Sequence, residues 1–132
     1  MIVVDTSAIL TALAGQPPTT SLVDRLRTDG DLHAPHLLDV EVLSALRGLV
    51  IGGKLSADRA GDVRVDFADL SVTLYPHHPL ADRIWDLRHT MTAYDAAFVA
   101  LAEALDVPLI TCDARLAATS GHAATIELVA AP

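Results

Sequence analysis

The chain has 132 residues, of which 52% are hydrophobic and 20% charged, and its 9 Lys and Arg residues against 17 Asp and Glu residues give a formal net charge of −8. This length suits one domain that buries a sizeable core. A chain this acidic lacks the basic face that binds nucleic acid by general counterion release. If the substrate is a polyanion, bound metal ions or a local group of arginines would have to supply the positive charge. The same charge favours a basic protein partner.

What the sequence lacks excludes several classes of protein. No apolar run approaches the roughly 18 residues of a membrane helix, and the N-terminus lacks the basic segment of a secretory signal, so we expect a cytoplasmic protein with no membrane partner. The one cysteine, Cys112, rules out an internal disulfide and a cysteine-based zinc site. So high a hydrophobic content leaves apolar surface for a partner, and we expect an oligomer.

The predicted elements alternate between strands and helices. A β-branched apolar run at residues 1–4 predicts a buried strand, and a short helix follows it from Thr6 to Leu13, ended by Gly15 and the pair Pro17 and Pro18. Further helices are predicted at residues 21–28, 37–51, 56–70, 77–89, 96–105 and from 114, and further strands at residues 32–34, 71–75, 108–112 and 124–129.

This alternation implies an α/β fold: a three-layer α/β/α sandwich with a central, mostly parallel sheet, formed by residues 1–132 as a single domain. The helix at residues 96–105 carries only one charge, Glu103, and is expected to be buried. Phe67 and Trp85 are interpreted as core residues, although Trp85 also suits an interface. The six histidines have no metal-ligand spacing and are expected to be solvated or to bond locally. Four acids at helical spacing are expected to face water: Asp58, Asp62, Asp66 and Asp69.

Four other acids fall where the pattern predicts a sheet edge or the inward side of a helix. Asp5 and Asp113 each follow an apolar strand and open a helix. Asp95 opens the buried helix, and Glu41 lies at the margin of the apolar face of its own helix. Since ligand sites in parallel sheets lie beyond the carboxyl ends of the strands, two strands would deliver acids to one edge. Each acid also has a purely structural interpretation: the three aspartates as helix N-caps, and Glu41 as the partner of Arg47.

Together, these carboxylates predict a metal site. Their mutual repulsion would raise their pKa values and destabilise the fold unless cations neutralised them. A ligand set made of oxygen atoms favours one or two magnesium or manganese ions. Such ions lower the pKa of a bound water and clamp a phosphate, which suits phosphodiester hydrolysis and explains how an acidic protein could act on a polyanion.

Four motifs occur in order along the chain. They are Val4-Asp5-Thr6-Ser7-Ala8, then Val40-Glu41-Val42-Leu43-Ser44-Ala45-Leu46, then Tyr94-Asp95-Ala96 with Leu101-Ala102, and last Leu109-Ile110-Thr111-Cys112-Asp113-Ala114-Arg115-Leu116. Together they resemble a PIN-domain ribonuclease, and most closely the VapC toxins of bacterial VapBC toxin–antitoxin modules. The resemblance spans almost the whole chain, and the length agrees.

The resemblance implies a compact α/β/α sandwich and a divalent-metal-dependent endoribonuclease that acts on structured RNA such as tRNA or rRNA. It also implies a homodimeric toxin that a cognate VapB-like antitoxin neutralises in a heterotetramer or larger assembly. The family's catalytic and metal-binding acids match Asp5, Glu41, Asp95 and Asp113 in this sequence.

Other positions of this chain also match the family. Its hydroxyl positions, which orient ligands or bind metal-site water, match Thr6 or Ser7, and Thr111. Arg115 is a candidate contact for a phosphate, or equally the partner of a surface acid. Some relatives carry a further acid just beyond the fourth, whereas here Ala114 and Arg115 follow Asp113, so the sequence is compatible with one metal ion or with two. The mechanism expected is in-line attack by a metal-activated water, leaving 5′-phosphate and 3′-hydroxyl ends.

Three other interpretations of the acids compete with this one. A phosphatase using Asp5 as nucleophile needs a second acid two residues later, where this chain has Ser7. A receiver-like domain that accepts a phosphoryl group requires a lysine after one of its last strands. Lys54 is the only lysine of this chain, and it follows a predicted helix. A catalytically inactive PIN-like protein-binding module is the remaining alternative; the presence of all four acids argues against it, and a metal titration would distinguish it.

Overall fold

The computed structural model describes residues 1–15 and 19–130, so the predicted stop at Pro17 and Pro18 lies outside the described residues. Five strands form one sheet in the order β3-β2-β1-β4-β5, and every neighbouring pair is parallel. The strands are β1 (Ile2–Val4), β2 (Leu32–Pro35), β3 (Val72–Tyr75), β4 (Leu109–Thr111) and β5 (Ile126–Leu128). The predicted parallel sheet is confirmed.

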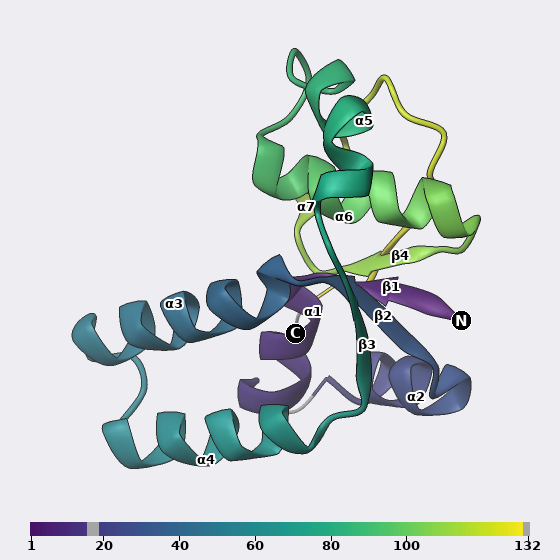
Figure 1. The fold of residues 1–132 in the computed structure, drawn as a ribbon. Coiled ribbons are helices and arrows are strands. Elements are labelled where there is room, and N and C mark those ends of the chain that lie inside the picture. Colours follow the sequence, from purple (N-terminus) through teal and green to yellow (C-terminus); the bar gives the residue numbers. More distant parts are fainter. Residues whose placement is uncertain (16–18, 131–132) are drawn as a thin grey trace.

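The helices cover both faces of this sheet, which confirms the three-layer α/β/α sandwich (Figure 1). α5 and α6 lie on one side, α1 and α2 lie on the other, and α3 and α4 extend together away from the sheet as an arm. The helices are α1 (Thr6–Ala14), α2 (Thr20–Asp29), α3 (Leu37–Ile51), α4 (Ala57–Asp69), α5 (Ala81–Asp86), α6 (Ala93–Leu105) and α7 (Ala114–Ala117), and a 3-10 turn, η1 (His78–Leu80), precedes α5.

The core lies around β1, the central strand, whose three residues are fully buried. α6 packs beside it with seven consecutive buried residues, Ala96–Ala102, most of them alanines that let the helix approach the sheet closely. The prediction that this helix is buried is therefore correct. Glu103, near the C-terminal end of α6, receives two hydrogen bonds from Arg83 at 2.8 and 2.9 Å and one from the Ala123 N–H at 2.8 Å.

Local sequence signals account for most helix ends. Asp5 and Ser56 cap α1 and α4 by accepting hydrogen bonds from the Ala8 and Arg59 N–H groups. Gly30 ends α2 in the left-handed region, at φ 67°, where a side chain is strained. The four acids Asp58, Asp62, Asp66 and Asp69 are exposed on α4, as predicted.

Two predictions on the segment before α6, and one on the start of α6 itself, are wrong. The helix expected at residues 77–89 is broken into η1 and a short α5 that ends at Asp86, because Pro79 supplies no N–H and restricts the residue before it. Trp85 is not a core residue: 66% of its surface is exposed, while Leu87 is buried. Asp95 is not an N-cap, because α6 begins two residues earlier and Thr92 caps it, its Oγ1 accepting from the Asp95 N–H at 3.2 Å.

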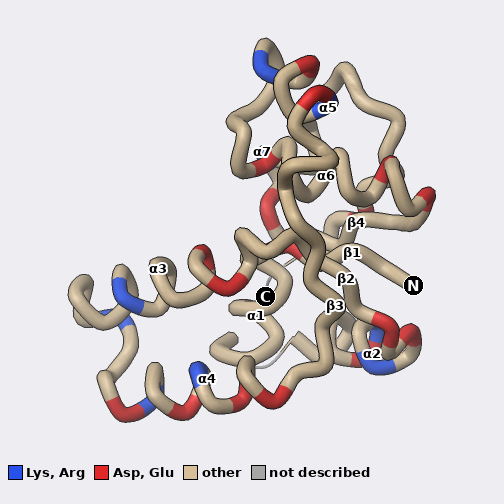
Figure 2. Tube along the Cα trace, viewed as in Figure 1, with Lys and Arg blue, Asp and Glu red and all other residues tan. Residues whose placement is uncertain are grey.

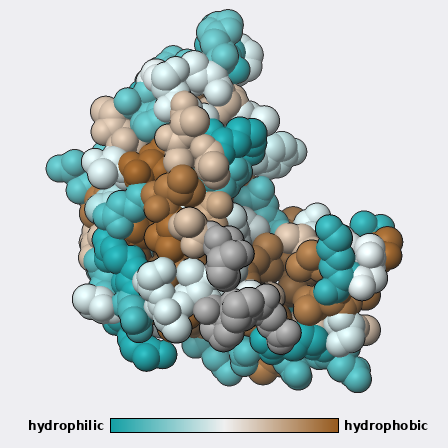
Figure 3. All heavy atoms as spheres, turned by 180° about the vertical axis from the view of Figure 1, so that it is seen from behind, coloured by the Kyte–Doolittle hydropathy of each residue, from teal (hydrophilic) through white to brown (hydrophobic). Residues whose placement is uncertain are grey.

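Apolar side chains also reach the surface of the arm, which Figure 3 shows on its right-hand side. Leu43, Ile51 and Val65 are 48%, 68% and 49% exposed there. Large apolar side chains exposed in this way are available for a protein–protein contact. None of the helices within residues 1–15 and 19–130 has the length and apolar character needed to span a membrane.

Candidate metal centre

Asp5 follows the central strand and is buried at the carboxyl edge of the sheet, 6% exposed. Its Oδ1 accepts hydrogen bonds from Ser7 Oγ at 2.7 Å and from the Ala8 N–H at 2.9 Å. Its Oδ2 accepts one from Thr111 Oγ1, at the end of the neighbouring strand β4. Burial raises the pKa of this carboxyl although all three hydrogen bonds oppose the shift. The site therefore holds Asp5 firmly while disfavouring its charge.

Glu41 lies on α3 and turns toward the same edge. Thr6 Oγ1, in the first turn of α1, donates a hydrogen bond to Glu41 Oε1 at 2.9 Å. Partial burial raises the pKa of Glu41, and the nearby charges of Asp95 and Asp5 raise it further. The suggested pairing with Arg47 does not occur among the hydrogen bonds and ion pairs of the described residues. Its partner is instead the hydroxyl beside Asp5.

Asp113 and Asp95 both contact the guanidinium group of Arg115. Asp113 caps α7 by accepting from the Arg115 and Leu116 N–H groups. Arg115 Nη2 lies 3.3 Å from Asp113 Oδ2 and 3.0 Å from Asp95 Oδ2. The contact with Asp95 is an ion pair without hydrogen-bond geometry, so Asp95 Oδ2 is a buried oxygen that receives no hydrogen bond from the described residues.

The structure thus brings all four predicted acids to one place, where β1, β4, α3 and α6 meet. Asp113 lies close enough to Asp5 for its charge to raise the Asp5 pKa, and Asp5 and Asp95 act in the same way on Glu41. Figure 2 shows acidic segments gathered between α3, α7 and the end of β1. Because like charges held together destabilise a fold, this arrangement favours a bound cation.

Three hydroxyls keep the acids in position. Besides bonding Asp5, Thr111 Oγ1 accepts from the Asp113 N–H at 3.0 Å and lies 3.2 Å from Ser7 Oγ. Ser7 Oγ in turn accepts from the Cys112 N–H at 2.9 Å. The hydroxyls of Thr6, Ser7 and Thr111 therefore tie α1 to α3 and to β4.

The donor set fits a hard divalent cation, since it consists of carboxylate oxygens and one of them, Asp95 Oδ2, is buried without a hydrogen-bond donor. In residues 1–15 and 19–130, however, no three His, Cys, Asp or Glu side chains stand close enough together to ligate one ion. Two of the acids explain this: Asp5 is turned toward its hydroxyls, and Asp113 toward the α7 backbone and Arg115. Metal binding would require Arg115 to leave Asp95 and the carboxylates to rotate.

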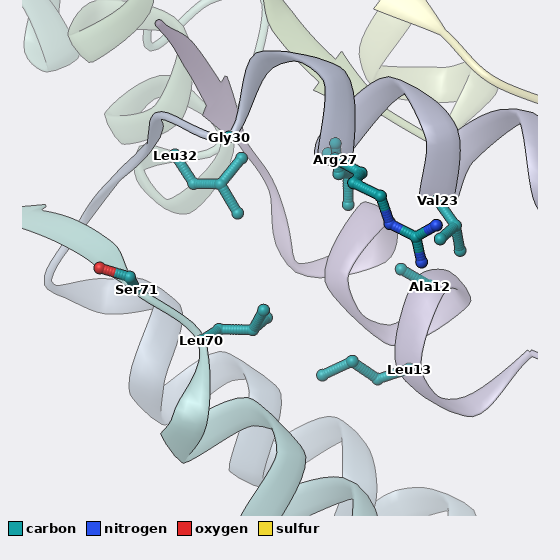
Figure 4. Close-up of a pocket in the computed structure, with 9 residues that line it drawn as sticks. Ala12, Leu13, Val23, Arg27, Gly30, Leu32, Leu70 and Ser71 are labelled. Carbon is teal, nitrogen blue, oxygen red and sulfur yellow. The ribbon is translucent and has the colours of Figure 1, made fainter.

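An apolar cavity of about 390 Å³ lies elsewhere, between α1, α2 and the start of β3 (Figure 4). Leu32 and Ser71, which line it, stand at the amino ends of β2 and β3, the edge of the sheet opposite Asp5. No acid lines it. This cavity is therefore separate from the acidic centre.

A surface that sequence reasoning missed surrounds Trp85. The Arg88 guanidinium carbon lies 4.5 Å from the centroid of the Trp85 ring, and the two side chains line a pocket with His77 and His78. The spacing of three residues between Trp85 and Arg88 is a signal for such a contact on a helical turn, but the pattern alone did not show that both would face water.

A parallel α/β/α sheet with carboxylates gathered at its carboxyl edge defines an acid-centred α/β domain. The family model described as "PIN domain" matches residues 2–121. The chain is 45% identical to "Ribonuclease VapC12" of Mycobacterium tuberculosis over 130 residues, which are 98% of this chain and 100% of that protein. The chain therefore belongs to the PIN-domain family, among its VapC ribonucleases.

Solved structures agree with the fold. PAE2754 from Pyrobaculum aerophilum superposes with a TM-score of 0.71 at 22% identity, over 95% of this chain and 81% of its own. VapBC2 from Rickettsia felis, described as bound to a DNA fragment from their promoter, gives a TM-score of 0.67 at 14% identity over 96% and 98% of the two chains.

Proposed function

We propose that this chain is the toxin of a toxin–antitoxin pair, an endoribonuclease that hydrolyses phosphodiester bonds in structured RNA, tRNA or rRNA, with magnesium or manganese. The observation that carries the proposal is the meeting of Asp5, Glu41, Asp95 and Asp113, from four different elements, at one edge of the sheet. A related protein that shares 45% of its residues is named a ribonuclease, which supports this activity.

The four acids would hold one or two ions. A bound ion lowers the pKa of a water and stabilises the charge that develops on the phosphate. The residues of this chain do the rest: Thr111 and Ser7 fix the orientation of Asp5, Thr6 fixes Glu41, and the buried Asp95 Oδ2 is left without a hydrogen-bond donor. Arg115, freed from Asp95, is 66% exposed and placed to pair with a phosphate of the RNA.

The partner would be a basic antitoxin segment, and the toxin would dimerise. The net charge of −8 and the exposed apolar residues of the arm support a basic, amphipathic partner. VapC20 of Mycobacterium tuberculosis, whose fold this chain shares, is described as a toxin that cleaves the sarcin–ricin loop. Toxin, antitoxin and RNA would meet in the bacterial cytoplasm.

The test is incubation of total bacterial tRNA and rRNA with the purified protein and Mg²⁺ or Mn²⁺, beside an EDTA control and the Asp95→Asn variant. We expect discrete fragments with 5′-phosphate and 3′-hydroxyl ends, absent with EDTA and in Asp95→Asn. Fragments ending in 2′,3′-cyclic phosphate would contradict the water mechanism. Asp66→Asn, on the exposed face of α4, is the matched control and should cut like the wild type.

The inactive PIN-like binding module stays the second candidate because Arg115 already pairs with Asp95 and Asp113 and no three acids stand together around one point within the described residues. Such a module would bind Mn²⁺ no better than its Asp95→Asn variant and would cut none of the RNAs.

A further inference from the structure

A pocket of about 540 Å³ lies where η1, α5 and the start of α6 come together. Trp85, Arg88, His77, His78 and Ile84 line it, and we name it the Trp85 pocket. Within residues 1–15 and 19–130 no acid lines it, although the chain is acidic; Asp82 and Asp86 belong to α5 but are not among its lining residues. The pocket thus combines an aromatic ring, a guanidinium and two imidazoles.

This pocket lies next to the acidic centre. His77 Nε2 accepts a hydrogen bond at 2.9 Å from the N–H of Leu37, the first residue of α3, and Glu41 follows one turn later on that helix. At its other end the pocket is lined by Ala93, the first residue of α6, and Asp95 follows two residues later. The pocket is therefore bounded by the starts of the two helices that carry Glu41 and Asp95.

The Trp85 and Arg88 side chains form a preassembled stacking surface. The guanidinium lies over the indole ring at 4.5 Å from its centroid, and Arg88 Nη1 is held in place by donating to the Trp85 carbonyl oxygen at 2.9 Å. Trp85 is nevertheless 66% exposed, and Tyr94, beside Asp95, is 63% exposed. Nucleobases stack on aromatic rings and on guanidinium planes, and arginine also pairs with phosphate, so this chemistry suits an unpaired nucleotide.

We propose that the Trp85 pocket binds one unpaired nucleotide of the RNA, close to the phosphate that is cut, with the base stacked on Trp85 and Arg88. The inference rests on the proposed ribonuclease function, which it deepens by placing part of the substrate. The Arg88 guanidinium in the lining favours a polyanion over the basic antitoxin segment, which the acids and the arm suit better. It requires that the RNA present a loop or bulge at the cleavage site.

Trp85 is the only tryptophan of the chain, so tryptophan fluorescence, excited selectively over that of the two tyrosines, reports on this pocket alone. The experiment titrates the full-length protein, in EDTA to prevent cleavage, with a 12-nucleotide single-stranded oligoadenylate. We expect saturable quenching that weakens as salt is added. Arg88→Gln should raise the apparent Kd at least about fivefold, because half of the stacking surface is lost. Arg64→Gln, an exposed arginine on α4, should leave the Kd unchanged.

The outcomes separate this inference from the proposed function. No quenching by a protein that cuts RNA would overturn the pocket assignment and leave the ribonuclease standing. Quenching that is lost in Arg88→Gln would support the pocket even if no RNA were cut, in which case the ribonuclease proposal fails alone. Fluorescence that changes with protein concentration but not with RNA would assign the surface to a second copy of the chain and overturn the inference.

A kinetic readout checks the same point with the active enzyme and metal. Arg88→Gln should raise the KM for a cleaved RNA while kcat changes little, since Arg88 lies beside the acids rather than among them. An unchanged KM would contradict the proposal.

Discussion

Thr111→Val tests how the acidic centre is held together. Thr111 is fully buried, and its hydroxyl donates to Asp5 Oδ2 while accepting from the Asp113 N–H at 3.0 Å. Valine keeps the shape of the side chain and removes only these polar contacts. A hydrogen bond to a charged group contributes about 1.5–3 kcal/mol, and leaving the partly buried N–H without an acceptor costs about 1 kcal/mol more. We therefore expect the free energy of unfolding to fall by about 3 kcal/mol.

The assay is urea unfolding followed by circular dichroism at fixed protein concentration in EDTA, with thermal unfolding as a second measure. For a chain of this size, about 3 kcal/mol corresponds to a drop in Tm of roughly 10 °C. Thr111→Ser keeps the hydroxyl and loses one buried methyl group, so it should cost only about 1 kcal/mol. Thr73→Val makes the same chemical change at an exposed position of β3 and should alter stability by no more than about 0.5 kcal/mol.

Equal losses in Thr111→Val and Thr111→Ser would show that packing matters and the hydroxyl does not. A Thr111→Val protein as stable as the wild type would refute the view that this hydroxyl ties Asp5 to Asp113.

Three further predictions concern charge, backbone and the arginine at the site. The hydrogen bonds from Arg83 lower the pKa of Glu103, so the stabilisation they give is present above the ordinary glutamate pKa of about 4.3 and is lost as the pH falls through the lowered pKa. Glu103→Gln should therefore lower the free energy of unfolding by about 1 kcal/mol at pH 7. The difference between variant and wild type in urea unfolding should vanish in acid. Gly30→Ala should lower the free energy of unfolding by about 1 kcal/mol, because φ is 67° at this position. Gly61→Ala lies inside α4 with open space for the new methyl group, so it should raise the free energy of unfolding by about 0.5–1 kcal/mol. Shifts of the same sign in the two variants would contradict the backbone argument. Arg115→Gln should tighten Mn²⁺ binding by no more than about fivefold in calorimetry without RNA. The variant frees Asp95 from its ion pair, which is weak because the Arg115 side chain is largely exposed. Weaker Mn²⁺ binding by the variant would show that Arg115 supports the site.

The sequence contains enough information to predict most of the fold and the place of the four acids. Asp5 and Asp113 could be located because each ends a short apolar run, and the carboxyl ends of parallel strands share an edge. Both are helix caps as well as members of the acidic cluster, so the two interpretations of these residues do not exclude one another. Glu41 could be located from its place at the margin of an apolar face.

The start of α6 could not be predicted from apolar spacing, because Tyr94 is exposed and Ala93 carries no pattern. Trp85 was misplaced for a related reason. In its segment, Leu80, Ile84 and Leu87 follow the helical spacing of a buried face, and Trp85 lies beside that face in sequence but outside it in space. Hydrophobicity alone does not distinguish a buried position on the helix face from the exposed position beside it.

The contact of Arg115 with Asp95 depends on the tertiary structure. It joins α7 to the first turn of α6 between residues 20 positions apart in the sequence, and the local pattern around Arg115 predicts only its pairing with Asp113. The side-chain orientations that keep three acids from meeting around one point are likewise outside the reach of spacing arguments.

The central claim is that the four acids form a divalent-metal site, and Mn²⁺ titration by calorimetry tests it most directly. The wild type and Asp66→Asn, the control on the outer face of α4, should bind Mn²⁺ alike, whereas Asp95→Asn should bind at least about tenfold more weakly, as expected when a ligand is removed. Equal Mn²⁺ binding by all three folded proteins would contradict the account.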